Sequence, residues 1–143
     1  MANPPFEILE HTADVGLRAF GETIPDLFSN AARGMIAIAL EGEPETQTAK
    51  PKQCRKFTVR GEDREELLVH FLSEVLYALD TEGWQFSDFR IRRIAPRQMW
   101  VEAWGERKER SEHSRVAVKA VTYHQVSVTQ TSDGWEAVVY FDI

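Results

Sequence analysis

Two aspartates and one lysine are the residues of this sequence whose positions suggest chemistry. Asp14 lies in the segment His11-Thr12-Ala13-Asp14-Val15-Gly16, which connects two short strand patterns. An aspartate in a tight connection usually accepts hydrogen bonds from nearby backbone N–H groups. The alternative is a metal or anion site in a loop that two rigid strands hold in place. The local pattern leaves both interpretations of Asp14 open.

The second candidate is the end of the sequence, Phe141-Asp142-Ile143. The alternating strand pattern of residues 135–141 runs up to this end, so we expect it to be held in a sheet. The Asp142 side chain and the α-carboxylate of Ile143 would then repel each other unless a cation joins them. Ca²⁺ and Mg²⁺ prefer such oxygen ligands, and Asp14 at the same sheet edge would add a third carboxylate. The alternative is a frayed, solvated terminus.

The third candidate, Lys119, lies in the run Val116-Ala117-Val118-Lys119-Ala120-Val121-Thr122-Tyr123-His124. A lysine in the middle of an apolar strand is costly unless its amine reaches water or a carboxylate. One interpretation is an edge strand with a lysine that extends into solvent. The other is a cation directed at an acidic site or at a phosphate.

Familiar enzyme motifs are absent from the sequence. It has no Gly-rich phosphate loop, no Gly-x-Ser-x-Gly elbow, no HExxH zinc motif and no dinucleotide fingerprint. Cys54 is the only cysteine, which excludes an internal disulfide and a cysteine-based zinc cluster. The four histidines are scattered along the chain. We therefore predict no catalytic residue.

The composition indicates a folded chain with an uneven charge distribution. The 143 residues are 43% hydrophobic and carry a net charge of −6, which excludes a disordered acidic tail and fits one domain over residues 1–143. Basic residues nevertheless concentrate in segments 50–60 and 90–119. These segments are either an anion-facing surface or solvated strands and loops. The sequence has no membrane-spanning run or signal peptide pattern, so we expect a cytoplasmic protein.

The order of the expected elements predicts an α+β fold. Apolar residues at helical spacing indicate helices over residues 23–39 and 63–79, with Thr23 as the N-cap of the first. Asp133-Gly134 is a hairpin signal between the last two strand patterns. We expect one largely antiparallel or mixed sheet packed with the two helices. The expected strands are 6–10, 16–20, 55–60, 86–94, 99–104, 116–123, 126–131 and 135–141.

Five segments of this sequence, in order, resemble the archease family. The first is the His11–Gly16 segment, and the last is the end Phe141-Asp142-Ile143. The resemblance covers essentially the whole chain, and five ordered matches are far more specific than any one of them. The three segments between them are Asn30-Ala31-Ala32-Arg33-Gly34-Met35, Glu65-Glu66-Leu67-Leu68 and Lys119-Ala120-Val121-Thr122-Tyr123-His124.

The resemblance implies a protein that is not an enzyme by itself. Archeases activate the GTP-dependent RNA ligase of tRNA splicing: they promote its guanylylation, allow multiple turnover and can broaden its nucleotide use. The family pattern implies a metal site at Asp14, Asp142 and Ile143, with calcium as the expected ion and Mg²⁺ or Mn²⁺ as alternatives. It also implies roles in ligase activation for Lys119 and for His11 of the opening motif. The expected partner is this ligase, with tRNA involved indirectly and no membrane.

Two other function classes stay open from the residues alone. A tRNA-binding module or chaperone could use Arg90, Arg92, Arg93 and Arg97 with Trp100 and Trp104, because aromatic side chains beside basic ones suit single-stranded RNA. The acidic remainder of the chain argues against this class. A metal-dependent hydrolase would need a base or nucleophile that we cannot assign. The strand over residues 55–60 could pair with a second copy of the chain, although its charges favour a protected edge.

Overall fold

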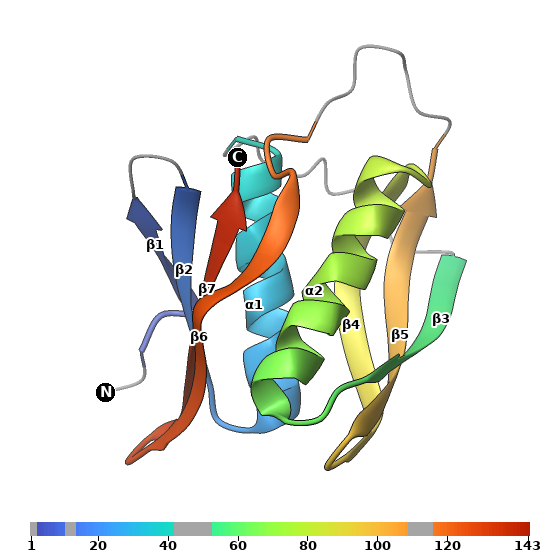
Figure 1. Cartoon of the computed structure of the whole chain (residues 1–143). Coiled ribbons are helices and arrows are strands. Elements are labelled where there is room, and N and C mark those ends of the chain that lie inside the picture. The colour runs from blue at the N-terminus through green and yellow to red at the C-terminus, as the bar shows by residue number, and fades with distance from the viewer. Residues whose placement is uncertain (1–2, 11–13, 42–52, 109–115) are drawn as a thin grey trace.

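Two α-helices lie between two antiparallel β-sheets in the computed structural model of the chain (Figure 1). The structure describes residues 3–10, 14–41, 53–108 and 116–143. In chain order the elements are β1 (Phe6–Glu10), β2 (Asp14–Gly21), α1 (Ile24–Ala39), β3 (Gln53–Arg60), α2 (Arg64–Asp80), β4 (Trp84–Ala95), β5 (Gln98–Arg107), β6 (Ala120–Thr131) and β7 (Gly134–Asp142).

The strands divide into a four-stranded sheet of order β1-β2-β7-β6 and a three-stranded sheet of order β3-β5-β4. Every neighbouring pair is antiparallel. The predicted α+β class with two helices is therefore confirmed. The strands form two sheets where the sequence favoured one, because the apolar helices need cover on two sides. As predicted, β3 is an edge strand.

Local caps fix where both helices begin. The Thr23 hydroxyl accepts a hydrogen bond from the backbone N–H of Asp26 at 3.2 Å, as its predicted N-cap role requires. The Asp63 carboxylate does the same for the N–H of Glu66 at 2.8 Å. Glu65 and Glu66 in the first turn of α2 also complement the positive end of the helix dipole.

An aromatic cluster around Phe71 ties both helices to the three-stranded sheet. Phe71, on α2, is fully buried, and nine residues of this helix are buried in all. Its ring centroid lies 5.9 Å from that of Phe28 on α1, 6.2 Å from Phe57 on β3 and 6.1 Å from Phe89 on β4. Such aromatic pairs add to the free energy gained from burial. The same cluster of buried residues also includes Leu17 and Phe141 of the four-stranded sheet, so the core is continuous from one sheet to the other.

The region before the last hairpin differs from its prediction. The two strands predicted over residues 116–123 and 126–131 are one strand, β6, whose register shifts between Thr122 and Ser127. Gln125 has a φ of 53° within this irregularity. The extra residues bulge out of the ladder, so the strand continues past a polar stretch without breaking. Residues 116–119 precede the strand and are not part of it.

The predicted β6–β7 hairpin is confirmed, with its turn one residue earlier than expected. Thr131 pairs with Gly134, so Ser132 and Asp133 form the two-residue turn. Gly134 has a φ of +143°, and a Cβ there would lie 2.4 Å from the carbonyl oxygen of Gly21. Only glycine fits this position.

Two smaller observations complete the fold. Neither described helix is long and apolar enough to cross a membrane. The segment between α1 and β3 lies mostly outside the described residues.

We predict that Phe71→Ala lowers the free energy of unfolding by about 3–5 kcal/mol, because it leaves a cavity among three aromatic rings. Urea denaturation followed by circular dichroism measures the change. Tyr77→Ala on the same helix is the matched control: Tyr77 is 52% exposed, so its loss should cost less than about 1 kcal/mol. Equal effects of the two substitutions would contradict the role of the cluster.

Candidate functional site

The register of β2 with β7 places two aspartates directly opposite each other. Asp14 is the first residue of β2 and Asp142 is the last of β7, and the two are paired in the ladder. The next pair, Val15 with Phe141, anchors this register because Phe141 is fully buried. A slip of β7 by one residue would expose Phe141 and turn Asp142 toward the core, away from Asp14. Burial of one phenylalanine therefore fixes the positions of both carboxylates.

Both aspartates lie on the outer face of the four-stranded sheet, away from the helices. The buried residues of β7 alternate with Asp142, and those of β2 alternate with Asp14 in the same way. Asp142 is exposed and Asp14 is half-buried. Directly opposite residues in an antiparallel pair have Cβ atoms roughly 4.5–5.5 Å apart, and like charges there repel. A cation between the two carboxylates would remove this repulsion.

Lys119 lies on the other side of Asp142. Its backbone N–H donates a hydrogen bond to the carbonyl oxygen of Asp142 at 2.8 Å, and the next residue, Ala120, pairs with Asp142 in the β6–β7 ladder. Lys119 is exposed and precedes β6, so its predicted place in the middle of a strand is wrong. The apolar run continues across the start of β6, which is why the sequence does not reveal this boundary.

The remaining predicted site residues are Ile143 and His11. Ile143 follows Asp142 directly and is 47% exposed at the end of β7, which Figure 1 shows between β2 and β6. His11 lies outside the described residues. The fold thus brings Asp14, Asp142, Ile143 and Lys119 to one end of the sheet. Their binding of a metal stays a prediction.

The donors at this end of the sheet suit a hard cation. Two side-chain carboxylates face each other there, and Ca²⁺ and Mg²⁺ bind such oxygens in preference to nitrogen or sulfur. Within the described residues, no three His, Cys, Asp or Glu side chains gather into a group that could hold a metal ion. A complete coordination shell therefore needs further oxygens, from Ile143, from the rest of the backbone or from water.

Two aromatic residues adjoin the aspartate pair. Tyr140 shares the outer face with Asp142 and pairs with Gly16, where a Cβ would lie 2.7 Å from the Tyr140 ring. The ring of His124 lies edge-on to Tyr140 with centroids 6.1 Å apart. The alternation of β7 predicts the face of Tyr140. The position of His124 depends on the β6 irregularity, which has no signal in the sequence.

Charged residues elsewhere form ion pairs that hold elements together. Arg55 on β3 contacts Glu74 at 2.8 Å and Glu82 at 2.7 Å, which ties this edge strand to α2 and to the segment after it. Burial acts to lower the pKa of the Arg55 guanidinium, because it disfavours the charged form. The hydrogen bonds and the negative charges of Glu74 and Glu82 have the larger combined effect and raise this pKa. Burial, followed by the charge of Glu102, raises the pKa of Cys54, so this thiol is not an activated nucleophile.

A cavity of about 620 Å³ lies at the other end of β2 and β7. Its lining includes Gly21, Arg33, Asp88 and Trp135, and Arg33 pairs with Asp88 at 3.3 Å. The aspartate pair at Asp14 and Asp142 does not line it. The cavity is therefore separate from the candidate site.

Comparison with known proteins gives consistent matches along the chain. The sequence model of the archease protein family matches residues 6–143. The chain is 34% identical to protein archease of Methanosarcina barkeri, covering 96% of this chain and 95% of that protein. It is 40% identical to protein archease of Saccharolobus islandicus, covering 96% and 98%.

Solved structures agree with these matches. The solution structure of Methanobacterium thermoautotrophicum protein 1598 is 29% identical, with a TM-score of 0.78 over 97% of this chain and 99% of that one. The crystal structure of an archease from Thermotoga maritima, described as a possible chaperone, shares the fold with a TM-score of 0.56 at 22% identity, over 100% of this chain and 98% of that one. The resemblance predicted from the five sequence segments is confirmed: this chain belongs to the archease family.

Proposed function

We propose that this protein activates the GTP-dependent RNA ligase of tRNA splicing, as a protein cofactor and not as an enzyme. Membership of the archease family supports this function. The observation that carries the proposal is the pairing of Asp14 with Asp142 at an accessible sheet end, next to Lys119. A partner protein can reach these groups because Asp142 and Lys119 are exposed.

Asp14, Asp142 and Ile143 are the residues that would hold a divalent ion. Calcium is the expected ion, and Mg²⁺ or Mn²⁺ would use the same oxygen ligands. A bound ion would neutralise the two opposed carboxylates and give the sheet end an open coordination position for an oxygen of the partner. Lys119 adds a positive charge beside Asp142, suited to a carboxylate or a phosphate.

Guanylylation explains why such a site would help a ligase. Attack on the α-phosphate of GTP needs metal ions and triphosphate in one arrangement, and positioning with charge neutralisation supplies most of the rate. The aspartate pair and Lys119 would act on the ligase either by setting the metal arrangement in its active site or by resetting its conformation. Both routes would allow repeated turnover and could broaden nucleotide use. We expect the protein to act in the cytoplasm, together with the ligase. The tRNA is then the substrate of the ligase, and this protein affects it only through the ligase.

We predict that Asp14→Asn and Asp142→Asn each lower stimulation of ligase guanylylation by at least about tenfold, and that Lys119→Ala lowers it as well. The asparagines keep the size of the side chains and remove the charges that hold a cation. The measurement is the rate of GMP transfer from GTP to the ligase with stoichiometric activator and no RNA.

Asp133→Asn is the matched control for these variants. Asp133 is an exposed aspartate of the same sheet, in the β6–β7 turn next to β7 and far along that strand from Asp142. It should leave stimulation unchanged. Full stimulation by all three site variants would overturn the assignment.

We also predict that calcium raises the melting temperature of the wild-type protein. Ligand at 100 times its Kd stabilises the folded state by about 2.7 kcal/mol, which for a chain of this size is roughly 5–10 °C. Removal of calcium by a chelator should reverse the shift, and Asp142→Asn should abolish it. In chelator, Asp142→Asn should melt no lower than wild type, since it relieves the repulsion from Asp14. A wild-type melting temperature that does not respond to calcium, Mg²⁺ or Mn²⁺ would contradict the metal site.

A further inference from the structure

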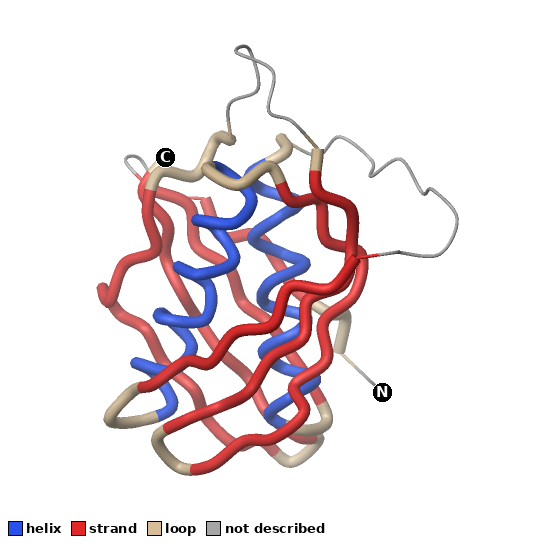
Figure 2. Tube along the Cα trace, turned by 90° about the vertical axis from the view of Figure 1, so that its right-hand side faces the viewer, coloured by secondary structure: helices blue, strands red, loops and turns tan. Residues whose placement is uncertain are grey.

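The three-stranded sheet has one face on the helices and one face toward solvent. Along the central strand β5, Met99, Val101 and Ala103 are buried against the helices, while Trp100, Glu102 and Trp104 alternate with them on the outer side. In Figure 2, which looks onto this side, the strands lie in front and no described segment crosses them. The row on β5 is the middle of an open surface.

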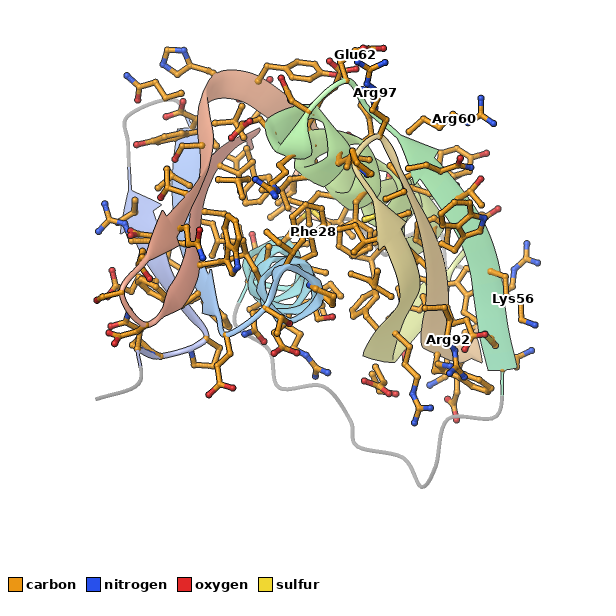
Figure 3. The ribbon with its side chains drawn as sticks, turned by 90° about the horizontal axis from the view of Figure 1, so that it is seen from below. Phe28, Lys56, Arg60, Glu62, Arg92 and Arg97 are labelled. Carbon is orange, nitrogen blue, oxygen red and sulfur yellow. The ribbon has the colours of Figure 1, made fainter. Side chains whose placement is uncertain are left out.

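Basic side chains flank this row on both sides. Lys56 on β3 and Arg90 on β4 pair with Glu102 across the sheet, so all three share the outer face. Arg60 on β3 and Arg92 on β4 are also exposed there. Figure 3 shows Lys56 and Arg60 on the side of the sheet that faces away from Phe28 in the core. Basic residues from the two basic segments of the sequence thus meet on one face because β3 and β4 both pair with β5.

The described side chains of this face carry a positive balance. Four basic residues, Lys56, Arg60, Arg90 and Arg92, stand against Asp88, Glu102 and Glu106, a balance of +1 in a chain whose net charge is −6. Arg92 contacts Glu102 at 2.9 Å, and this hydrogen bond lowers the pKa of the Glu102 carboxyl. The ion pair fixes the guanidinium of Arg92 over the sheet, beside Trp100.

A groove of about 500 Å³ crosses this surface, lined on the outer side by Lys56, Thr58, Arg92, Trp100 and Glu102. An indole between a lysine and an arginine can stack on a base while the cations contact the neighbouring phosphates. Trp104 lies four residues along β5 on the same face, roughly 14 Å away at about 3.4 Å per residue. The face therefore offers two aromatic positions, of which Trp100 is the one with basic neighbours.

We propose that the outer face of β3-β5-β4 binds single-stranded RNA, with a base on Trp100 and phosphates on Lys56, Arg60 and Arg92. Single strands are favoured over duplexes because stacking needs an unpaired, accessible base. RNA is favoured over a protein because basic residues outnumber acidic ones on this face of an otherwise acidic chain and lie beside an accessible indole. The choice of RNA over DNA rests on the proposed function in tRNA splicing. This face belongs to a different sheet from Asp14 and Asp142.

The test is fluorescence anisotropy of a labelled 12-nucleotide RNA titrated with the full chain, without ligase, at several salt concentrations. Trp100→Ala should weaken binding by roughly tenfold, and Trp100→Phe should restore most of it, because phenylalanine keeps a stacking surface. Lys56→Ala should weaken binding and lower the slope of log Kd against log salt by about 0.7, the value for one lost phosphate contact.

Arg18→Ala is the matched control, since Arg18 lies on the outer face of the other sheet and pairs with Glu136 at 2.9 Å. It should not change RNA affinity. Equal affinity of wild type and Trp100→Ala would overturn the proposal, as would equal binding of duplex RNA or of a DNA strand of the same length. Loss of ligase binding in Trp100→Ala with unchanged RNA affinity would assign the face to a protein and also overturn it.

The ligase-activation proposal and the RNA-binding proposal can be tested independently of each other. Guanylylation needs no RNA, so Trp100→Ala should stimulate the ligase as wild type does in that assay, while Asp142→Asn should lose stimulation and keep its RNA affinity. If Asp142→Asn stimulates normally, the site assignment fails and the RNA-binding face is unaffected. If RNA affinity does not depend on Trp100, the RNA-binding proposal is wrong and the ligase proposal is unaffected.

Discussion

Burial of α2 on two sides is the constraint on which the rest of the structure depends. Nine residues of this helix are buried, which is more than one sheet can cover, so the chain places a sheet on each side. Phe71 and its neighbouring rings connect the helices to the three-stranded sheet, and the buried core continues to Leu17 and Phe141 of the other sheet. Each sheet consequently has one face committed to the core and one face in solvent. Both surfaces that we associate with function lie on these solvent faces, where they can change without disturbing the core.

The candidate site shows how a packing contact can position charged groups. Asp14 and Asp142 have no intrinsic reason to approach each other, since opposed carboxylates repel. They are held together because the buried Phe141 and its partner Val15 fix the strand register one residue away. The free energy of burying an aromatic ring exceeds the repulsion between two partly solvated charges. The burial of Phe141 thus places the two aspartates opposite each other at the end of the sheet.

Features set by neighbouring residues could be predicted from the sequence, and features set by distant ones could not. The caps Thr23 and Asp63 and the apolar spacing of the helices are local, so both helices were predictable to within a residue or two. The end Asp142-Ile143 was a candidate because of residue type and place, and so was Asp14, which the sequence placed in a connection and the structure places at the start of β2. The division into two sheets, the irregularity in β6 and the true position of Lys119 depend on which strands pair, and that is decided by long-range packing.

The position of β7 has a consequence for synthesis on the ribosome. This strand is the last element of the chain, yet it lies between β2 and β6 in the middle of its sheet. The three-stranded sheet comes from the continuous segment Gln53–Arg107 and can assemble while translation continues. By contrast, β2 pairs with β7 only after residues 134–142 have left the exit tunnel. Until then one edge of β2 is unpaired and able to join a foreign strand, which makes the nascent chain a natural client for chaperones.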